Sequence, residues 1–231
     1  MTASPSAFVD RFALERLPPR TAWPELIAEL PELAYPDRLN AAKVLLDDRV
    51  AAGCGARRCL LDDHAAWSYA ELQDRVDRIA RVLQGEGVVP GNRVLLRAPN
   101  NPMLVAQWLA VLKLGAIVVT TMPLLRPREL VQVIAKGRIS HAICDARLEA
   151  DLRTAQVQAP VLRHILIAHS DAADGLEARM AAAPGHRHVL LGADWLVKWR
   201  RSDAKQPWGA DPDDAAWLAA VAGHPQFRAV T

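Results

Sequence analysis

The sequence predicts an α/β fold: a doubly wound, mostly parallel sheet with helices on both faces, followed by an irregular C-terminal tail. The main observation is a strand–helix–strand pattern. Arg93–Leu96 is a short, mostly apolar run, and Ala116–Thr120 is rich in β-branched residues. Between them, Asn101 can cap a helix whose first position is Pro102. Strands joined by such a crossover are parallel, which is the second basis for the fold class.

The helix inside this unit is almost wholly apolar. From Met103 to Leu114, the strongly polar residues are Gln107 and Lys113, which predicts a buried helix with almost no solvent-facing side. Gly115 supplies its C-terminal stop. Because parallel sheets are covered on both faces, we expect the rest of the chain to cover this helix and to extend this sheet.

Composition is that of an ordinary globular protein. The 231 residues are 51% hydrophobic and 23% charged, and a net charge of +2 gives no electrostatic case for nucleic acid. Three cysteines (Cys54, Cys59 and Cys144) do not make a disulfide framework and suit a reducing compartment. The sequence shows neither an apolar run of membrane-spanning length nor a signal-peptide core. We therefore expect a cytoplasmic protein with neither nucleic-acid nor membrane partners.

Residues 1–40 are predicted to form a proline-rich N-terminal arm. Six prolines leave room only for short helical turns, at Phe8–Leu17 and Trp23–Leu30. Apolar residues such as Leu33 and Tyr35 are unlike those of a free tail. We expect the arm to lie across the surface of the main domain.

The main α/β domain is predicted to span residues 41–184, and its first elements are a helix and a hairpin. Helical spacing runs over Leu39–Ala52 and stops at Gly53. Arg58–Asp62 and Trp67–Tyr69 are then predicted to pair as a β-hairpin.

A capping box, Ser68 with Glu71, begins the clearest amphipathic helix of the chain. Acid-to-base pairs four residues apart, Asp74–Arg78 and Asp77–Arg81, are expected on its solvent side. Glycines at 85 and 87 end the helix. Its predicted apolar stripe consists of Leu72, Val76, Ile79, Ala80 and Leu83.

After the strand–helix–strand unit, helices and strands alternate, which predicts further parallel strands of the same sheet. The expected elements are a loop at Thr121–Pro127, a helix at Arg128–Lys136 stopped by Gly137, a strand at His141–Cys144, a helix at Ala146–Ala155 with a Glu149–Arg153 pair, a strand at Val161–Ala168 and a helix at Gly175–Ala183.

Residues 185–231 are predicted to be a divergent tail, poorly ordered or loosely packed. Hydrophobic periodicity weakens there, and we expect a helix only around Asp213–Val221. Basic residues between Lys198 and Lys205, interleaved with tryptophans, could hold nucleic acid by stacking and charge. Acidic residues surround them, so a solvated tail is the preferred interpretation.

Short motifs give no catalytic set. Gly53-x-Gly55 lacks the third glycine of a dinucleotide fingerprint and precedes a strand, so we interpret it as a turn after a helix. His186 and His188 have no ligand partner at metal-site spacing and are interpreted as solvated loop residues. His141 and His164, at the start and in the middle of predicted strands, are interpreted as structural.

Two common nucleophile and phosphate motifs are also missing from the sequence, which has neither a Gly-x-Ser-x-Gly elbow nor a glycine-rich loop ending in Gly-Lys-Ser/Thr. Thr120–Pro123 follows a strand that we expect to be central, at the end where open α/β sheets bind ligands. This loop is either a ligand site or a plain connection.

Several motifs together carry a family resemblance. They are Leu17–Arg20, Leu33–Asn40, Trp67–Leu72, Pro90–Arg126 and Ser140–Asp145. Through them the chain from about residue 8 to residue 183 resembles the N-terminal portion of the AMP-forming acyl-CoA synthetases. Within that superfamily it is most similar to the benzoate and 2-aminobenzoate CoA ligases, so its fold should be the N-terminal subdomain of an adenylate-forming ligase.

The resemblance implies a two-step ligase reaction. A carboxylate attacks the α-phosphate of ATP, with magnesium screening the phosphates, and the thiol of coenzyme A then displaces AMP from the acyl-adenylate. An aromatic carboxylate is therefore the implied substrate, and ATP, Mg²⁺ and CoA are the implied cofactors, none of which is expected to bind this chain tightly.

The sequence departs from the family where its Ser/Thr/Gly-rich phosphate loop is expected, after the helix ending near Ala183. Asp211–Gln226 offers a similar context but has neither serine nor threonine, and Gly223 is its single glycine. No catalytic, cofactor-binding or metal-binding residue of the family can therefore be assigned to a position here. We expect a truncated family member, inactive alone, whose sequence after about Gly185 is out of frame or divergent.

Two other hypotheses stay open on the sequence. One is a non-catalytic α/β module that binds a partner chain, or a second copy of itself, through an exposed core surface. The other is a generic nucleotide-binding doubly wound domain.

Overall fold

The computed structural model describes residues 7–24, 39–63 and 66–183. Its centre is a four-stranded sheet in the order β4-β3-β5-β6, with β3 at Arg93–Arg97, β4 at Ile117–Thr120, β5 at His141–Asp145 and β6 at His164–Ala168. All neighbouring pairs of this sheet are parallel. The predicted α/β fold with a parallel sheet is confirmed.

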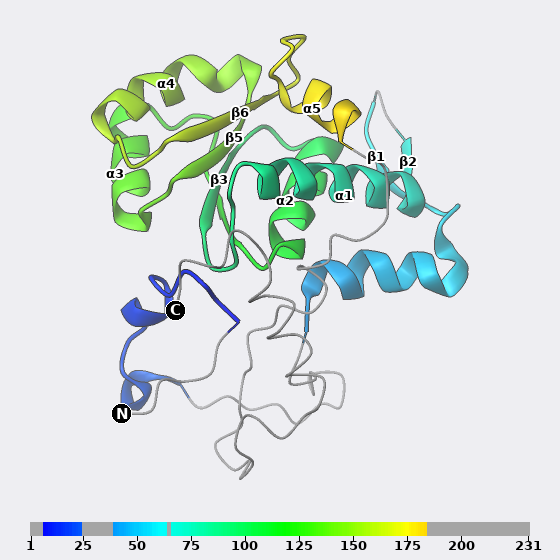
Figure 1. Cartoon of the computed structure of the whole chain (residues 1–231), viewed down its shortest axis with the longest axis horizontal. Helices are drawn as coiled ribbons and strands as arrows, with labels where there is room; N and C mark the ends of the chain where they lie inside the picture. Colours follow the sequence, from blue (N-terminus) through cyan, green and yellow to red (C-terminus); the bar gives the residue numbers. More distant parts are fainter. Residues whose placement is uncertain (1–6, 25–38, 64–65, 184–231) are drawn as a thin grey trace.

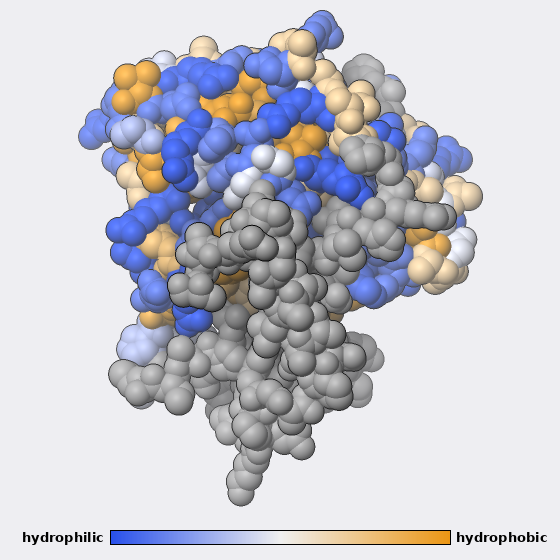
Figure 2. Space-filling model, in the orientation of Figure 1, coloured by the Kyte–Doolittle hydropathy of each residue, from blue (hydrophilic) through white to orange (hydrophobic). Residues whose placement is uncertain are grey.

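Helices cover both faces of this sheet (Figure 1). Helices α1 (Tyr69–Gly85), α2 (Pro102–Lys113) and α5 (Leu176–Ala182) share one buried cluster with the β3 residues Val94 and Leu96. Helices α3 (Pro127–Gly137) and α4 (Glu149–Gln158) share the other cluster with Leu95, and a 3₁₀ turn at Ala146–Leu148 precedes α4. On the face seen in Figure 2, hydrophilic residues predominate over the described part, as expected for helices that turn their apolar side to a sheet.

The predicted hairpin and capped helix are both present. β1 (Arg58–Leu61) pairs antiparallel with β2 (Ala66–Ser68), and the Ser68–Glu71 capping box begins α1 directly after it. Every residue of the predicted apolar stripe of α1 is buried. The Asp74–Arg78 pair forms at 2.8 Å, but Asp77 is buried rather than on the solvent side.

The helix expected at Leu39–Ala52 begins two residues later, and part of it has the wider turns of a π-helix. Residues 41–54 are helical and contain two π-helical stretches, Lys43–Asp47 and Val50–Cys54. A π-helix bonds residues five apart, so its side chains leave the 3.6-residue period on which the prediction rested. Both Leu45 and Leu46 fit the helical spacing of the sequence, but only Leu46 is buried, while Leu45 is 56% exposed.

The expectation that α2 is mostly buried is confirmed, but its small exposed side is apolar. Its two strongly polar residues, Gln107 and Lys113, are buried, whereas Val105 and Trp108 are more than one-third exposed. The position of a polar residue therefore does not mark the solvent side of this helix. Lys113 is buried because it has ionic partners on neighbouring elements.

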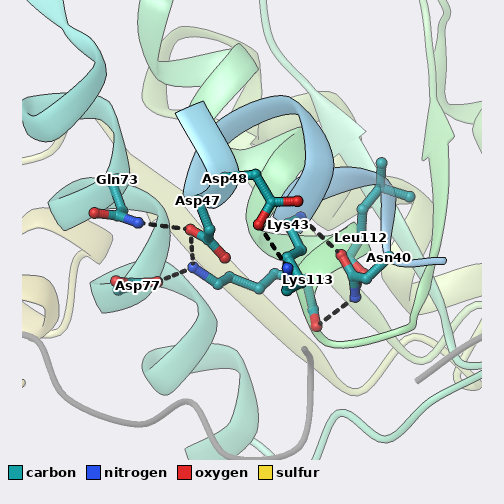
Figure 3. A network of polar contacts seen from close by, with 8 residues as sticks. All are labelled: Asn40, Lys43, Asp47, Asp48, Gln73, Asp77, Leu112 and Lys113. Carbon is teal, nitrogen blue, oxygen red and sulfur yellow. Dashed lines mark hydrogen bonds and ion pairs between the residues drawn. The ribbon is translucent and has the colours of Figure 1, made fainter. Parts of the chain in front are cut away.

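Those partners form the network in Figure 3. The Lys113 ammonium pairs with Asp77 of α1 and, at 2.8 Å, with Asp47 of the segment 41–54. Gln73 donates to Asp47 at 2.8 Å, and Asn40 donates to the carbonyls of Leu112 and Lys113 at the end of α2. Lys113 and Asp77 are both only 7% exposed. The network thus joins α1, α2 and the segment 41–54 around one buried cation.

Residues 7–24 contact the amino end of β3. The backbone amides of Val9 and Asp10 donate to the Pro90 carbonyl, and the Asp10 carboxylate pairs with Arg93 at 2.6 Å. Although burial pushes the pKa of Asp10 upward, hydrogen bonds from the Phe12 amide, Arg93 and Asn92 outweigh it and hold that pKa below its usual value. These contacts fix residues 8–12 on the sheet domain.

Other expectations differ in detail or fall outside the described residues. Helical structure in Phe8–Leu17 is confined to a 3₁₀ turn at Leu14–Arg16, with another at Arg20–Ala22. β6 begins at His164 instead of Val161, and the amides of Arg163 and His164 both donate to the Ser140 carbonyl at its start. Most of Trp23–Leu30 and all of Asp213–Val221 lie outside the described ranges, and the division into residues 1–40, 41–184 and 185–231 stays a prediction.

Gly91 and Gly87 form a matched pair for testing the contact with residues 7–24. Both have a φ of +86°, but a Cβ on Gly91 would lie 2.2 Å from the Asp10 carbonyl oxygen, while one on Gly87 would meet nothing within 4 Å. We expect Gly87→Ala to cost about 1 kcal/mol, from backbone strain alone. Gly91→Ala should cost about 1–3 kcal/mol more, from the added clash. Urea unfolding measures both, and equal losses would mean that residues 7–24 do not press on this turn.

Replacing the buried cation tests the network. Lys113→Met should destabilise the protein by about 3–5 kcal/mol, because it leaves the Asp77 carboxylate buried without its cation. The double variant Lys113→Met/Asp77→Leu should recover most of this loss. Lys43→Met removes a pair with Asp48 whose side chains are 45% and 47% exposed, and should change stability by less than about 1 kcal/mol. If Lys113→Met behaves like this control in urea unfolding, the network does not hold the elements together.

Candidate functional site

The carboxyl ends of the parallel strands meet at one edge of the sheet, where folds of this kind bind ligands. β3 ends at Arg97, β4 at Thr120 and β5 at Asp145. The loop 121–126 follows β4, and α4 begins shortly after β5. We call this region the carboxyl edge.

The buried side chain of Arg97 connects β3 to the loop and the helix at the carboxyl edge. It is fully buried and donates to the carbonyls of Met122, Pro123 and Leu125 at 2.9–3.1 Å. It also lies 3.6 Å from the Asp151 carboxylate of α4. A guanidinium carries five donors in a planar fork, so one side chain can hold a whole loop through its backbone. The loop 121–126 is therefore held at a defined place beside the start of α4.

Asp145 forms a second buried centre beside it. Its carboxylate, fully buried, accepts hydrogen bonds from the side chain of Arg147 at 2.8 and 3.0 Å and from its amide at 3.0 Å. His169, just beyond β6, adds an Nδ1 contact at 2.9 Å. The bonds from Arg147 lower the pKa of Asp145, and the same pairing raises the pKa of Arg147. Asp145 is thus held as a carboxylate that orients Arg147.

A hollow of about 260 Å³ lies between these two centres. Its polar lining comes from Arg126, Arg147 and Asp151. Arg126 is 79% exposed and Arg147 is 71% exposed, so both guanidinium groups are accessible to a ligand. The rest of the lining consists of Pro123, Leu124, Leu148 and Ala150.

The hollow is equipped for binding rather than for covalent chemistry. Arg126 lies 3.5 Å from the Asp151 carboxylate and Arg147 is paired with Asp145, but the exposed faces of both guanidiniums can accept an anionic group, and the apolar lining favours a small hydrophobic part beside it. Cys144, at the end of β5, is buried, and burial raises the pKa of its thiol to about 12, so it stays protonated. Within the described ranges, no cluster of three or more His, Cys, Asp or Glu side chains is arranged to hold a metal ion.

The loop singled out by sequence reaches this hollow, but not in the way expected. Pro123 lines it, yet β4 is an edge strand of the described sheet rather than a central one. The reason is that the chain returns from α3 to the other side of β3 instead of continuing past β4. Whether Thr120–Pro123 serves as a ligand site or only as a connection stays open.

Other sequence candidates lie elsewhere. Gly53 and Gly55 stand at the end of the segment 41–54, before β1, as expected for a turn after a helix. His141 and His164 begin β5 and β6 at the opposite edge of the sheet. His186, His188 and the basic residues from Lys198 to Lys205 lie outside the described residues.

Sequence reasoning missed Arg97, Asp145 and Arg147. The available signal was that Arg97 and Asp145 end apolar strands, where a charged side chain is carried to the carboxyl edge. What the sequence did not reveal is that Arg97 bonds to backbone carbonyls about 25 residues away, because such bonds depend on the path of the loop and not on its side chains.

One membrane-related observation completes the description. Among the helices that the structure describes, none is long and apolar enough to cross a bilayer.

Comparison with known proteins connects this domain to one family. The sequence model of the AMP-binding enzymes matches residues 47–219, which includes every element from β1 to α5. The salicyl-AMP ligase/salicyl-S-ArCP synthetase of Mycobacterium tuberculosis is 31% identical over 191 residues, or 80% of this chain and 30% of the relative. The 2-hydroxy-7-methoxy-5-methyl-1-naphthoate–CoA ligase of Streptomyces carzinostaticus is 35% identical over 133 residues, or 54% of this chain and 24% of the relative.

A solved structure agrees at the level of the fold. The anthranilate CoA ligase AuaEII, crystallised with anthranoyl-AMP, superposes with a TM-score of 0.62 at 19% identity, covering 69% of this chain and 30% of that one. The chain therefore spans less than a third of the length of the curated relatives described above.

Proposed function

This chain belongs to the AMP-binding enzyme family, and we propose that it forms part of the N-terminal scaffold of a ligase that activates an aromatic carboxylic acid. The observation that carries the proposal is the similarity, at 31% identity over 80% of the chain, to a ligase named for salicyl-AMP. The second relative and the solved structure are likewise named for aromatic acids.

The proposed reaction has two steps. An aromatic carboxylate oxygen attacks the α-phosphorus of ATP, forming an acyl–phosphate bond and releasing pyrophosphate. The thiol of coenzyme A then attacks the acyl carbon and AMP leaves, which gives the thioester. Both steps depend mainly on positioning and on stabilisation of phosphate charge.

We propose that the hollow at the carboxyl edge contributes to this chemistry by holding a phosphate group of ATP or of coenzyme A. Arg126 and Arg147 present accessible guanidiniums, the side chains best suited to phosphate. Arg97 fixes the loop that precedes Arg126, and Asp145 orients Arg147. The hollow is far smaller than either nucleotide, so it would take a terminal group and the ligand would bind weakly.

The sequence of this chain shows no phosphate-loop motif for the adenylation step. Residues 184–231 contain a single serine, Ser202, and a single threonine, Thr231, where the family resemblance calls for a Ser/Thr/Gly-rich phosphate loop. We therefore propose that the 231-residue chain binds its ligands weakly and does not turn over alone.

The function is tested by ATP–pyrophosphate exchange with benzoate, 2-aminobenzoate and salicylate. We expect no exchange above background with the 231-residue chain, because the phosphate loop is missing from its sequence. Exchange that depends on one of these acids would confirm the ligase assignment and overturn the proposed inactivity. Co-purification with a second chain at fixed stoichiometry, without any ligand effect, would instead favour a partner-binding module.

The hollow is tested by substitution of its arginines. We expect Arg126→Ala/Arg147→Ala to weaken the binding of coenzyme A and ATP, measured by NMR titration, by about a hundredfold or more, because two charge-assisted contacts of about 1.5–3 kcal/mol each are lost. Arg153→Ala removes an exposed arginine paired with Glu149 on α4 and is not part of the hollow's lining, so it serves as the matched control. Equal affinities in the double variant and the control would remove the hollow from the proposal.

A further inference from the structure

A carboxylate already stands in the hollow at the carboxyl edge. Asp151 lies in the first turn of α4 and is one of the residues that line the hollow. Its Oδ2 atom lies 3.5 Å from the guanidinium of Arg126, which lines the same hollow, and its side chain is 32% exposed. In the unliganded protein, Asp151 therefore takes the place beside Arg126 that an anionic ligand would need.

A second arginine holds Asp151 in this place from the protein interior. The same Oδ2 atom lies 3.6 Å from Arg97, whose side chain is only 1% exposed. A buried guanidinium requires a counter-charge close by, and in the part of the chain that the structure describes Asp151 is the carboxylate that pairs with it. The guanidinium of Arg97 is itself fixed by the carbonyls of the loop 121–126. Asp151 is thus tied to a group that cannot move with a ligand.

The two arginines that share Asp151 differ in freedom. The side chain of Arg126 is 79% exposed, whereas Arg97 is enclosed. The backbone amide of Arg126 donates to Glu129 at 2.9 Å, so the start of α3 does not depend on where the Arg126 guanidinium points. Arg126 can therefore turn from Asp151 to a ligand, while Asp151 stays with Arg97 at the wall of the hollow.

A count of charges shows what this wall does to an incoming anion. Arg147 is paired with Asp145, and Arg97 is paired with Asp151, so two of the three arginines have a negative counterpart of their own. Three arginines and two aspartates leave a net charge of +1. A group with one negative charge balances this set, whereas a group with two leaves excess negative charge beside Asp151.

We propose that Asp151 is a competitor built into the hollow. It occupies Arg126 until a phosphate takes its place, and it then remains at the wall, where its charge weakens the binding of doubly charged groups more than that of singly charged ones. Asp151 thereby sets the charge specificity of the hollow. This inference rests on the function proposed above, in which the hollow holds a phosphate group of ATP or coenzyme A.

Repulsion is the larger part of the effect. An exposed ion pair contributes little, so the exchange of partners at Arg126 costs little. The repulsion between Asp151 and the ligand grows in proportion to the ligand's charge. Across about 6 Å of water, it weakens the binding of a singly charged group about threefold and that of a doubly charged group about tenfold.

Phenyl phosphate and benzoate form a matched pair of probes. Both carry their anionic group on a phenyl ring, so the apolar lining of the hollow meets the same ring in each. At pH 7.5 benzoate has one negative charge and phenyl phosphate has two, because the second pKa of a phosphate monoester is about 6. Binding is measured by NMR titration at about 10 mM ionic strength, where screening is weak, through the amide signals of Leu124 and Ala150 in the lining.

Asp151→Asn removes the charge and nearly preserves the shape of the side chain. We expect it to tighten phenyl phosphate about tenfold and benzoate about threefold. Arg97 keeps its bonds to the loop carbonyls in this variant, so the hollow should keep its form. Glu149→Gln is the matched control, because Glu149 lies in the same turn of α4 but pairs with Arg153 and does not line the hollow. It should change both affinities by no more than about twofold.

The unaltered chain gives a measurement that depends on no variant. The signal of the Asp151 carboxyl carbon should shift as phenyl phosphate saturates the hollow, because Arg126 leaves this carboxylate, while that of Glu149 should stay in place. An unchanged Asp151 signal at saturation overturns the proposal, whether or not Asp151→Asn folds.

The outcomes separate this inference from the function proposed for the hollow. If phenyl phosphate binds the unaltered chain and Asp151→Asn equally well, Asp151 is no competitor, and the binding of phosphate by the hollow stands. Equal gains for the two probes in Asp151→Asn overturn the charge specificity. If phenyl phosphate binds neither chain, the function proposed for the hollow is wrong, and this inference is wrong with it.

Discussion

A single buried ammonium group, that of Lys113, determines how one face of the sheet is covered. It stands at the end of α2 between Asp77 and Asp47, on two different elements. A buried charge is tolerated only when its partners are in place, so the positions of α1 and of the segment 41–54 are tied to that of α2. The π-helical widening of Lys43–Asp47 occurs in the turn that brings Asp47 to this cation. Apolar contacts could be satisfied in several registers, whereas this ion pair is met in one.

The opposite face of the sheet uses two arginines in a comparable way. Arg93 and Arg97 stand four residues apart on β3, so they point to the same side as Leu95, toward α3 and α4. Arg93 donates to the carbonyls of Gly137 and Arg138 at the end of α3, and Arg97 donates to the loop that precedes α3. One strand thus holds both ends of one helix through backbone carbonyls. This arrangement fixes the loop beside the hollow without placing any demand on the loop's own side chains.

The difference between what could and could not be predicted follows from this chemistry. Local rules found α1, because the Ser68–Glu71 box and the apolar stripe are encoded within one turn or one helix, and they found the parallel sheet from the alternation of strands and helices. The same rules placed Asp77 on the solvent side and found no partner for Lys113, because these two partners are 36 residues apart. Arg97 was not predicted as a site residue for the same reason, because the carbonyls it binds lie 25 to 28 residues further along the chain. Searching the sequence for glycine-rich loops and nucleophile motifs did not find this edge, because it has neither. Its arginines donate hydrogen bonds to backbone carbonyls and to Asp145.

The two edges of the sheet consequently differ in what they can do. At the amino edge the polar groups are satisfied by one another: Arg93 by Asp10 and backbone carbonyls, and His141 by Glu86 and Ser140. At the carboxyl edge Arg97 and Asp145 are equally satisfied, but they leave Arg126 and Arg147 largely exposed. Arg126 gains little from its exposed pair with Asp151 and can exchange that neighbour for a phosphate at small cost, whereas Arg147 keeps its bonds to the buried Asp145 and can offer only its exposed face. In the described residues the carboxyl edge thus presents two exposed guanidiniums beside the hollow, and our proposal is that a phosphate group binds there.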